Sequence, residues 1–112
     1  MKEYKIHYEL IADPDAEGFV NVYTVNDAKK VKVKHIDVYF PSGTDGDLQI
    51  SFYYGHMKIA PHGGLINGDN CKVTVPIDLE LISGDTLRVY FKNRNTTDKK
   101  KAYIDIIVEE IS

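Results

Sequence analysis

The segment DPDAEG at residues 13–18 places three carboxylates, Asp13, Asp15 and Glu17, at alternate positions ahead of a glycine. This order is typical of the start of a calcium-binding loop, because Ca²⁺ is held by several oxygen ligands at short range. The twelfth position of an EF-hand loop is Glu, whereas this chain has Thr24 there, so the segment is not an EF-hand. We expect either a carboxylate site for calcium or magnesium, or an acidic turn that is solvated by water.

A second polar loop, PSGTDGD at residues 41–47, contributes two more carboxylates, and Asp69 lies in a third loop. A divalent cation needs several oxygen ligands. The carboxylates of these loops can therefore form one cation site only if the fold brings the loops to the same end of the domain. No residue is assigned as a confident metal ligand. The candidate cation ligands are Asp13, Asp15, Glu17, Asp45 and Asp47.

The segment YYGHMKIAPHGG at residues 53–64 contains two histidines, His56 and His62. Their spacing is not one of the usual zinc-ligand spacings, and no third ligand is near in sequence. Gly55 followed by His56 is instead typical of a two-residue hairpin turn of type II′, which takes glycine first. We therefore expect a turn at 55–56, and two histidines that are not partners.

Catalytic machinery is not recognisable in the sequence. There is no G-x-S-x-G motif, no glycine-rich phosphate loop ahead of a helix, and no marked pair of carboxylates of the kind a glycosidase needs. The one cysteine, Cys71, begins an apolar alternating run, which favours a small buried residue over a nucleophile. We predict no catalytic residues, with a small enzyme on the same scaffold as the less favoured alternative.

Tyrosines alternate with apolar residues along several predicted strands. Tyr53 and Tyr90 fall on the side opposite to their apolar neighbours, and Tyr23 does so if Val20 and Val22 face the core. An exposed tyrosine band suits a protein interface or a sugar-stacking surface, because the ring is apolar and its tip forms hydrogen bonds. The alternative is that tyrosine simply favours half-exposed strands. The absence of tryptophan favours self-association over carbohydrate binding.

The elements that must position these residues are strands, because the hydrophobic period is two almost everywhere and no three-turn amphipathic helix is present. Pro76 falls on the polar side of its run, which predicts an edge strand or a bulge there. The predicted strands are 3–11, 18–26, 31–40, 47–54, 57–60, 71–82, 85–93 and 102–111.

Eight antiparallel strands in a single domain of residues 1–112 favour a jelly-roll β-sandwich, with an immunoglobulin-like sandwich as the rival. In a jelly roll, strands 1, 8, 3 and 6 form one sheet and strands 2, 7, 4 and 5 form the other. The long loops 12–18, 41–47, 61–70 and 93–101 would then share one end. Clustered loops on a rigid scaffold are where binding usually resides.

The bulk composition narrows the class of partner. A formal net charge of −3 argues against a nucleic-acid binder, and no apolar run reaches the length of a membrane span or a signal sequence. Abundant Ile, Val, Lys, Glu and Tyr are similar to the composition of thermophile proteins, although low-GC genomes give the same bias. With no signal in the sequence as given, we expect a cytoplasmic or particle-associated protein.

The end of the chain, SGDTLRVYFKN at 83–93 followed by the alternating AYIDIIVEE at 102–110, resembles the last hairpin of many small β-sandwich proteins of virions, phage particles and secreted assemblies. The resemblance covers about thirty residues, and it implies a fold and an assembly role without transferring any site residue. We therefore predict a non-enzymatic structural subunit or homo-oligomer that binds itself or another protein. A module that binds carbohydrate or a divalent cation at the loop-rich end is the alternative.

Overall fold

The computed structural model describes residues 2–26, 30–61 and 64–111 of the chain. These residues form eight strands and no helix, and hence contain no helix that is long and apolar enough to cross a membrane. The strands are β1 (Lys2–Ala12), β2 (Glu17–Thr24), β3 (Lys30–Phe40), β4 (Leu48–Tyr54), β5 (Met57–Ala60), β6 (Cys71–Ile82), β7 (Thr86–Asn93) and β8 (Lys100–Glu110).

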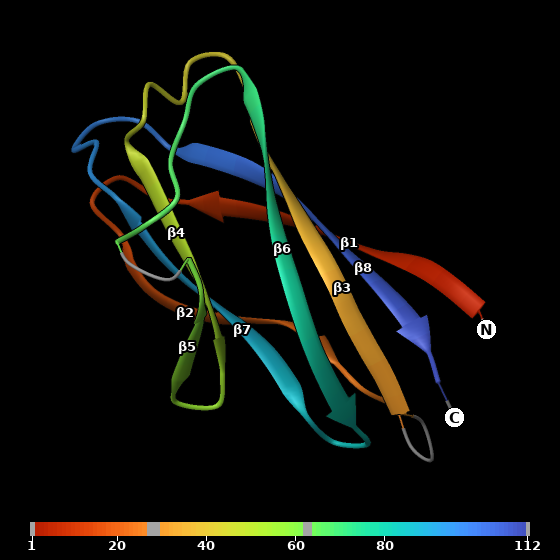
Figure 1. Cartoon of the computed structure of the whole chain (residues 1–112). Helices are drawn as coiled ribbons and strands as arrows, with labels where there is room; N and C mark the ends of the chain where they lie inside the picture. Colours follow the sequence, from red (N-terminus) through yellow and green to blue (C-terminus); the bar gives the residue numbers. More distant parts are fainter. Residues whose placement is uncertain (1, 27–29, 62–63, 112) are drawn as a thin grey trace.

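The strands pair into two four-stranded antiparallel sheets, in the orders β1-β8-β3-β6 and β2-β7-β4-β5 (Figure 1). This is the jelly-roll order that the sequence predicts. An immunoglobulin-like sandwich pairs its first two strands within one sheet. Here β1 and β2 lie in different sheets, so the rival fold is wrong.

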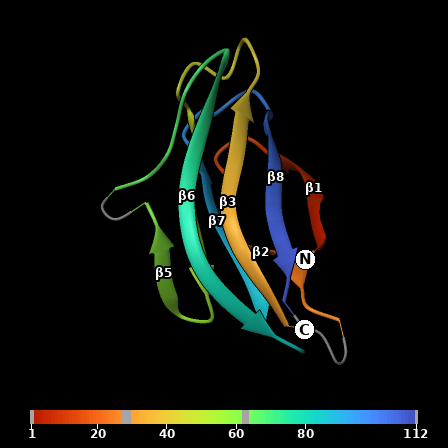
Figure 2. The ribbon, with the colours of Figure 1, turned by 45° about the vertical axis from the view of Figure 1, so that its right-hand side comes forward.

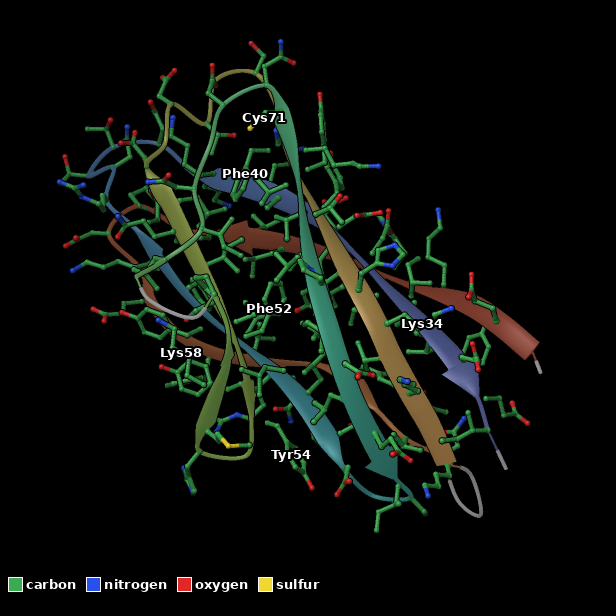
Figure 3. The ribbon with its side chains drawn as sticks, in the orientation of Figure 1. Lys34, Phe40, Phe52, Tyr54, Lys58 and Cys71 are labelled. Atoms are coloured by element: carbon green, nitrogen blue, oxygen red, sulfur yellow. The ribbon has the colours of Figure 1, made fainter. Side chains whose placement is uncertain are left out.

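Alternation along the strands explains why the two sheets pack face to face. Along β6, the side chains of Val75 and Leu81 are buried while Thr74 and Glu80 are exposed. The core between the sheets is apolar and centred on Phe40, Phe52, Ile36 and Leu87, none of which retains exposed surface. Figure 3 shows Phe40 and Phe52 projecting into the space between the two layers.

Among the described strands, the regular pairing is interrupted by register shifts in β2, in β3 and between β4 and β5. The register of β3 shifts between Val33 and His35, opposite Pro76 of β6, and β6 is also one of the two edge strands of its sheet. Both features that Pro76 predicts are therefore confirmed. Because of this bulge, the inward face of β3 changes from odd to even residue numbers after Val33, with Ile36 as the next buried residue.

The predicted hairpin turn is confirmed. Tyr54 pairs with Met57 across Gly55 and His56, and Gly55 has φ of 60°, the conformation that the first position of a type II′ turn requires. His56 lies exposed at this turn. His62 lies outside the described residues.

Hydrogen bonds bring the predicted loops together at one end of the sandwich (Figure 1). The Asp15 N–H donates to the Asn95 carbonyl at 2.8 Å, and the Arg94 N–H donates to the Asp47 carbonyl at 2.9 Å. The loop at 41–47 in turn meets the loop that ends at residue 70, since the Gly46 N–H donates to the Gly68 carbonyl at 3.1 Å. The four long loops therefore form one connected surface.

Candidate interaction surface

Aromatic side chains gather on the outer face of the sheet β2-β7-β4-β5. The Phe19 ring lies 5.1 Å from that of Tyr53, edge to face at 84°, and 5.3 Å from that of Tyr90, tilted at 59°. The Arg88 guanidinium lies 4.4 Å from the centre of the Phe19 ring, within range of a cation–π interaction. We call Phe19, Tyr53, Tyr90 and Arg88 the aromatic patch.

Strand register places these residues side by side. Phe19 of β2 is directly opposite Tyr90 of β7, and Arg88 of β7 is directly opposite Tyr53 of β4. Directly opposed residues on an antiparallel pair share a face and lie close enough for their side chains to touch. Val89, between Arg88 and Tyr90, is fully buried, so the patch must face outward.

Phe19 is the member that residue type alone does not reveal. A phenylalanine is expected in the core, yet this side chain is 47% exposed. The alternation along β2 does indicate this exposure, since an inward Val20 requires an outward Phe19.

Tyr23 does not belong to the patch, and its expected outward position is wrong. A bulge shifts the register of β2 between Asn21 and Tyr23, so Tyr23 is opposite Leu87, a fully buried core residue. Its ring packs against the core, and its hydroxyl lies 3.4 Å from the Tyr4 hydroxyl of the other sheet. Burial raises the pKa of Tyr23, and the hydrogen bond with Tyr4 adds to the shift.

Tyr90 connects the patch to the acidic loop at 13–18. Its hydroxyl donates a hydrogen bond to the carboxylate of Glu17, one of the predicted cation ligands. This hydrogen bond, followed by partial burial, raises the pKa of Tyr90 to about 12. Glu17 therefore fixes the orientation of the tyrosine ring at the margin of the patch.

The other predicted cation ligands lie at the loop-rich end but in separate settings. Asp13 lies 3.7 Å from the ammonium of Lys99, and Asp15 adopts a left-handed backbone with φ of 59°. Asp47 accepts a hydrogen bond from the Asn95 amide at 3.1 Å. The Asp13 carboxylate is thus paired with an ammonium group, and the Asp47 carboxylate with an amide.

Asp45 has a left-handed backbone, with φ of 55°, and its N–H donates to the Asp69 carboxylate at 3.0 Å. Asp69 also accepts the Gly43 N–H at 2.8 Å, and these backbone donors lower its pKa. The described part of the chain has no group of three His, Cys, Asp or Glu side chains placed to hold a metal ion. Cation binding remains a prediction.

The outer face of the sheet β1-β8-β3-β6 has a different character, because charged side chains dominate it. The His7 Nδ1 lies 2.6 Å from an Asp105 oxygen, and Lys34 lies 3.3 Å from Glu3. Tyr39 and Tyr103 stack there with ring centres 6.2 Å apart. Each surface ion pair of this kind contributes little to stability. We therefore interpret this face as a solvated surface.

An open groove of 430 Å³ lies between the edges of the two sheets, beside β5 and β6. Its walls are mainly apolar and include Ile59, Ile66, Val73 and Val75, and none of its lining residues carries an ionisable side chain. The lining also includes Thr74, whose hydroxyl donates a hydrogen bond to Asp37 at 2.7 Å.

The sequence matches no protein-family model and no curated protein. Solved structures match nearly the whole chain. It is similar to a chain of the acidic stable capsid structure of Helicobacter pylori bacteriophage KHP30, at 15% identity and a TM-score of 0.57, with 99% of both chains covered.

The chain is also similar to part of a chain from the structure of infectious bursal disease virus strain Gx, at 14% identity and a TM-score of 0.56. The similarity covers 98% of this chain but 32% of the viral one, so this chain spans about a third of that protein. A further match is FLHE, at 6% identity and a TM-score of 0.52, covering 96% of this chain and 97% of that one. Identities this low establish the shared β-sandwich fold alone.

Proposed function

We propose that this protein is a non-enzymatic structural subunit that assembles by self-association through its surfaces. The observation that carries the proposal is the aromatic patch on the outer face of a complete jelly roll. The patch consists of an exposed Phe19 with half-buried Tyr53, Tyr90 and Arg88 around it. Phe, Tyr and Arg are residue types enriched in protein interfaces.

The energetics of Phe19 favour a covered state. The side chain is 47% exposed, which leaves about 100 Å² of apolar surface in water for a residue of this size. Covering it would contribute about 2.5 kcal/mol at roughly 25 cal/mol per Å². That is the range of an interface hot spot.

The comparisons support the proposal at the level of fold. One of the similar structures is a phage capsid and another is a virus, and the similar chain of the phage capsid has nearly the same extent as this one. A jelly roll suits particle assembly because its two packed sheets give a rigid block with several distinct faces and edges.

Carbohydrate binding by the same patch is less favoured. Stacking against a sugar ring requires an aromatic face that lies flat on the surface. Here the Phe19 ring meets Tyr53 at 84° and Tyr90 at 59°, so the three rings do not share a plane. The patch is a compact apolar cluster, which suits a protein partner better.

The test compares two substitutions of similarly exposed aromatic residues on opposite faces. Phe19→Ser removes the centre of the aromatic patch, while Tyr39→Ser removes a 40% exposed ring from the other sheet. Sedimentation velocity across a concentration series should show at least tenfold weaker self-association for Phe19→Ser and near wild-type behaviour for Tyr39→Ser. If both variants self-associate equally strongly and their melting temperatures are unchanged, the aromatic patch is not an assembly interface.

A further inference from the structure

Each sheet has two edge strands, and three of the four edges carry features that hinder the addition of another strand. β2 is interrupted by the bulge at Asn21–Tyr23, and β5 has only four residues and a register shift of its own. β6 contains Pro76, which lacks an N–H, beside a bulge in its pairing with β3. Bulges, short strands and prolines are the usual protection of sheet edges against pairing with another chain.

β1 has none of these features. It pairs with β8 residue by residue, without a shift, from Lys2 opposite Glu110 to Ala12 opposite Lys100. It contains no proline, and it is the outermost strand of its sheet beside β8 (Figure 2). A regular edge of 11 residues presents a row of backbone donors and acceptors that a second strand can complete.

We propose that β1 is the dimerisation edge, and that its occupant is β1 of a second copy of this chain, added antiparallel about a two-fold axis. The inference rests on the proposed self-association and identifies the surface through which the first dimer forms. The product is a continuous eight-stranded sheet in which the inner faces of both copies lie on the same side. The aromatic patch lies on the other sheet and remains free for a second contact.

Charge complementarity fixes the register of this pairing. Full overlap of residues 2–12 places His7 opposite its own copy and Lys5 opposite Glu9 of the second copy, twice by symmetry. On the inner face the same register pairs Ile6 with Tyr8 of the second copy. Opposite charges placed directly across an antiparallel pair are stabilising, and like charges are destabilising.

Neighbouring registers lack this match. A slip of two residues in one direction places Glu3 opposite Glu9 of the second copy. A slip in the other direction leaves Lys5 opposite Ile11 and places His7 opposite Glu9, but His7 already lies 2.6 Å from Asp105 in its own chain. Lys5 and Glu9 can both form an ion pair with the second copy. The Lys5 side chain is 60% exposed and 4.0 Å from Asp105, and within the described residues Glu9 has no ion-pair partner in its own chain.

A charge exchange tests the interface. Lys5→Glu and Glu9→Lys each replace two opposite-charge pairs by two like-charge pairs, so we expect at least a tenfold rise in the dimer dissociation constant for each. The double variant Lys5→Glu/Glu9→Lys restores both pairs and should return to within about threefold of wild type. Lys72→Glu on the β6 edge is the matched control and should leave the constant unchanged, and melting temperatures report whether each variant is folded.

Two other outcomes are informative. If the wild type self-associates but neither single variant weakens it, the β1 edge is refuted while the proposed function stands. If the wild type is monomeric at all concentrations, the proposed function and this inference both fail.

Cysteine crosslinking tests the register independently of charge. Opposed Cα atoms in an antiparallel pair lie about 4.5–5.5 Å apart, within the range of a disulfide. In a Cys71→Ser background, His7→Cys should form a disulfide-linked dimer on mild oxidation. Glu9→Cys should not, because its two copies would lie about 13 Å apart along the strands. Equal crosslinking at both positions would overturn the proposed register.

Discussion

The buried amide of Asn93 is the strongest single connection within the loop-rich end. This side chain has no exposed surface, and its Nδ2 donates to the carbonyls of Ala12, Asp13 and Asp98 at 3.2, 3.0 and 3.0 Å. Its Oδ1 accepts the Asn95 N–H at 3.0 Å. One residue thus joins the loop after β1 to the loop after β7.

The cost of removing this amide follows from those contacts. A net hydrogen bond contributes about 1 kcal/mol, and a buried group left without its partner costs about 1–3 kcal/mol. Because the two N–H groups of the amide are shared among three carbonyls and some of these carbonyls regain water, we expect Asn93→Ala to lower the free energy of unfolding by about 3 kcal/mol. For a chain of this size that corresponds to a melting temperature lower by about 15 °C.

Urea unfolding followed by circular dichroism measures this change directly. Asn67→Ala is the matched control, because Asn67 is exposed and makes one hydrogen bond, at 3.3 Å, to the Gly46 carbonyl. The control should change stability by less than about 0.5 kcal/mol. A loss below about 1 kcal/mol for Asn93→Ala would refute the view that this amide holds the loop cluster together.

Two pH-dependent predictions follow from shifted groups. Backbone N–H donors lower the pKa of Asp69 below its ordinary 3.8, so its contribution to stability is present above that pH and is lost as the pH falls through the lower value of the folded state. Asp69→Asn should therefore lower the melting temperature at pH 7, and the difference from wild type should shrink toward pH 2; a constant difference would contradict this. Glu17 raises the pKa of Tyr90 to about 12, which adds stability below pH 10 that is lost as the pH rises toward 12. An absorbance titration of the tyrosines should show that Glu17→Gln shifts one phenol to lower pH, and an unchanged titration would rule out the hydrogen bond.

The strand order was predictable because hydrophobic alternation defines each strand and the loop lengths agree with one topology. The turn at Gly55–His56 supplied the fifth strand, and the short link at 83–84 joined the sixth and seventh. Eight strands with long loops at every second connection favour a jelly roll over an immunoglobulin-like sandwich. Pro76 even indicated the position of a bulge, because its missing N–H is tolerated only at an edge or an irregularity.

The candidate site was only partly predictable, because bulges change which side of a strand a residue faces. Tyr23 was placed outward by simple alternation, and the bulge after Asn21 turns it into the core. No residue in β2 marks that bulge as Pro76 does in β6. Phe19 was overlooked for the opposite reason, since its residue type suggested burial although alternation placed it outward.

The carboxylates at the loop-rich end show a second limit. Topology correctly brings the loops containing Asp13 and Asp47 together. It does not specify side-chain partners, and in the folded chain Lys99 lies beside Asp13 while Asn95 donates to Asp47. Spacing of acidic residues in a sequence therefore indicates shared location more reliably than shared coordination.

The proposed function requires that this jelly roll binds copies of itself. Sedimentation velocity of the wild-type chain from micromolar to millimolar concentration measures this self-association. We expect the weight-average mass to rise from the 12.7 kDa monomer to at least a dimer within this range. A single species of monomer mass at every concentration would contradict the claim.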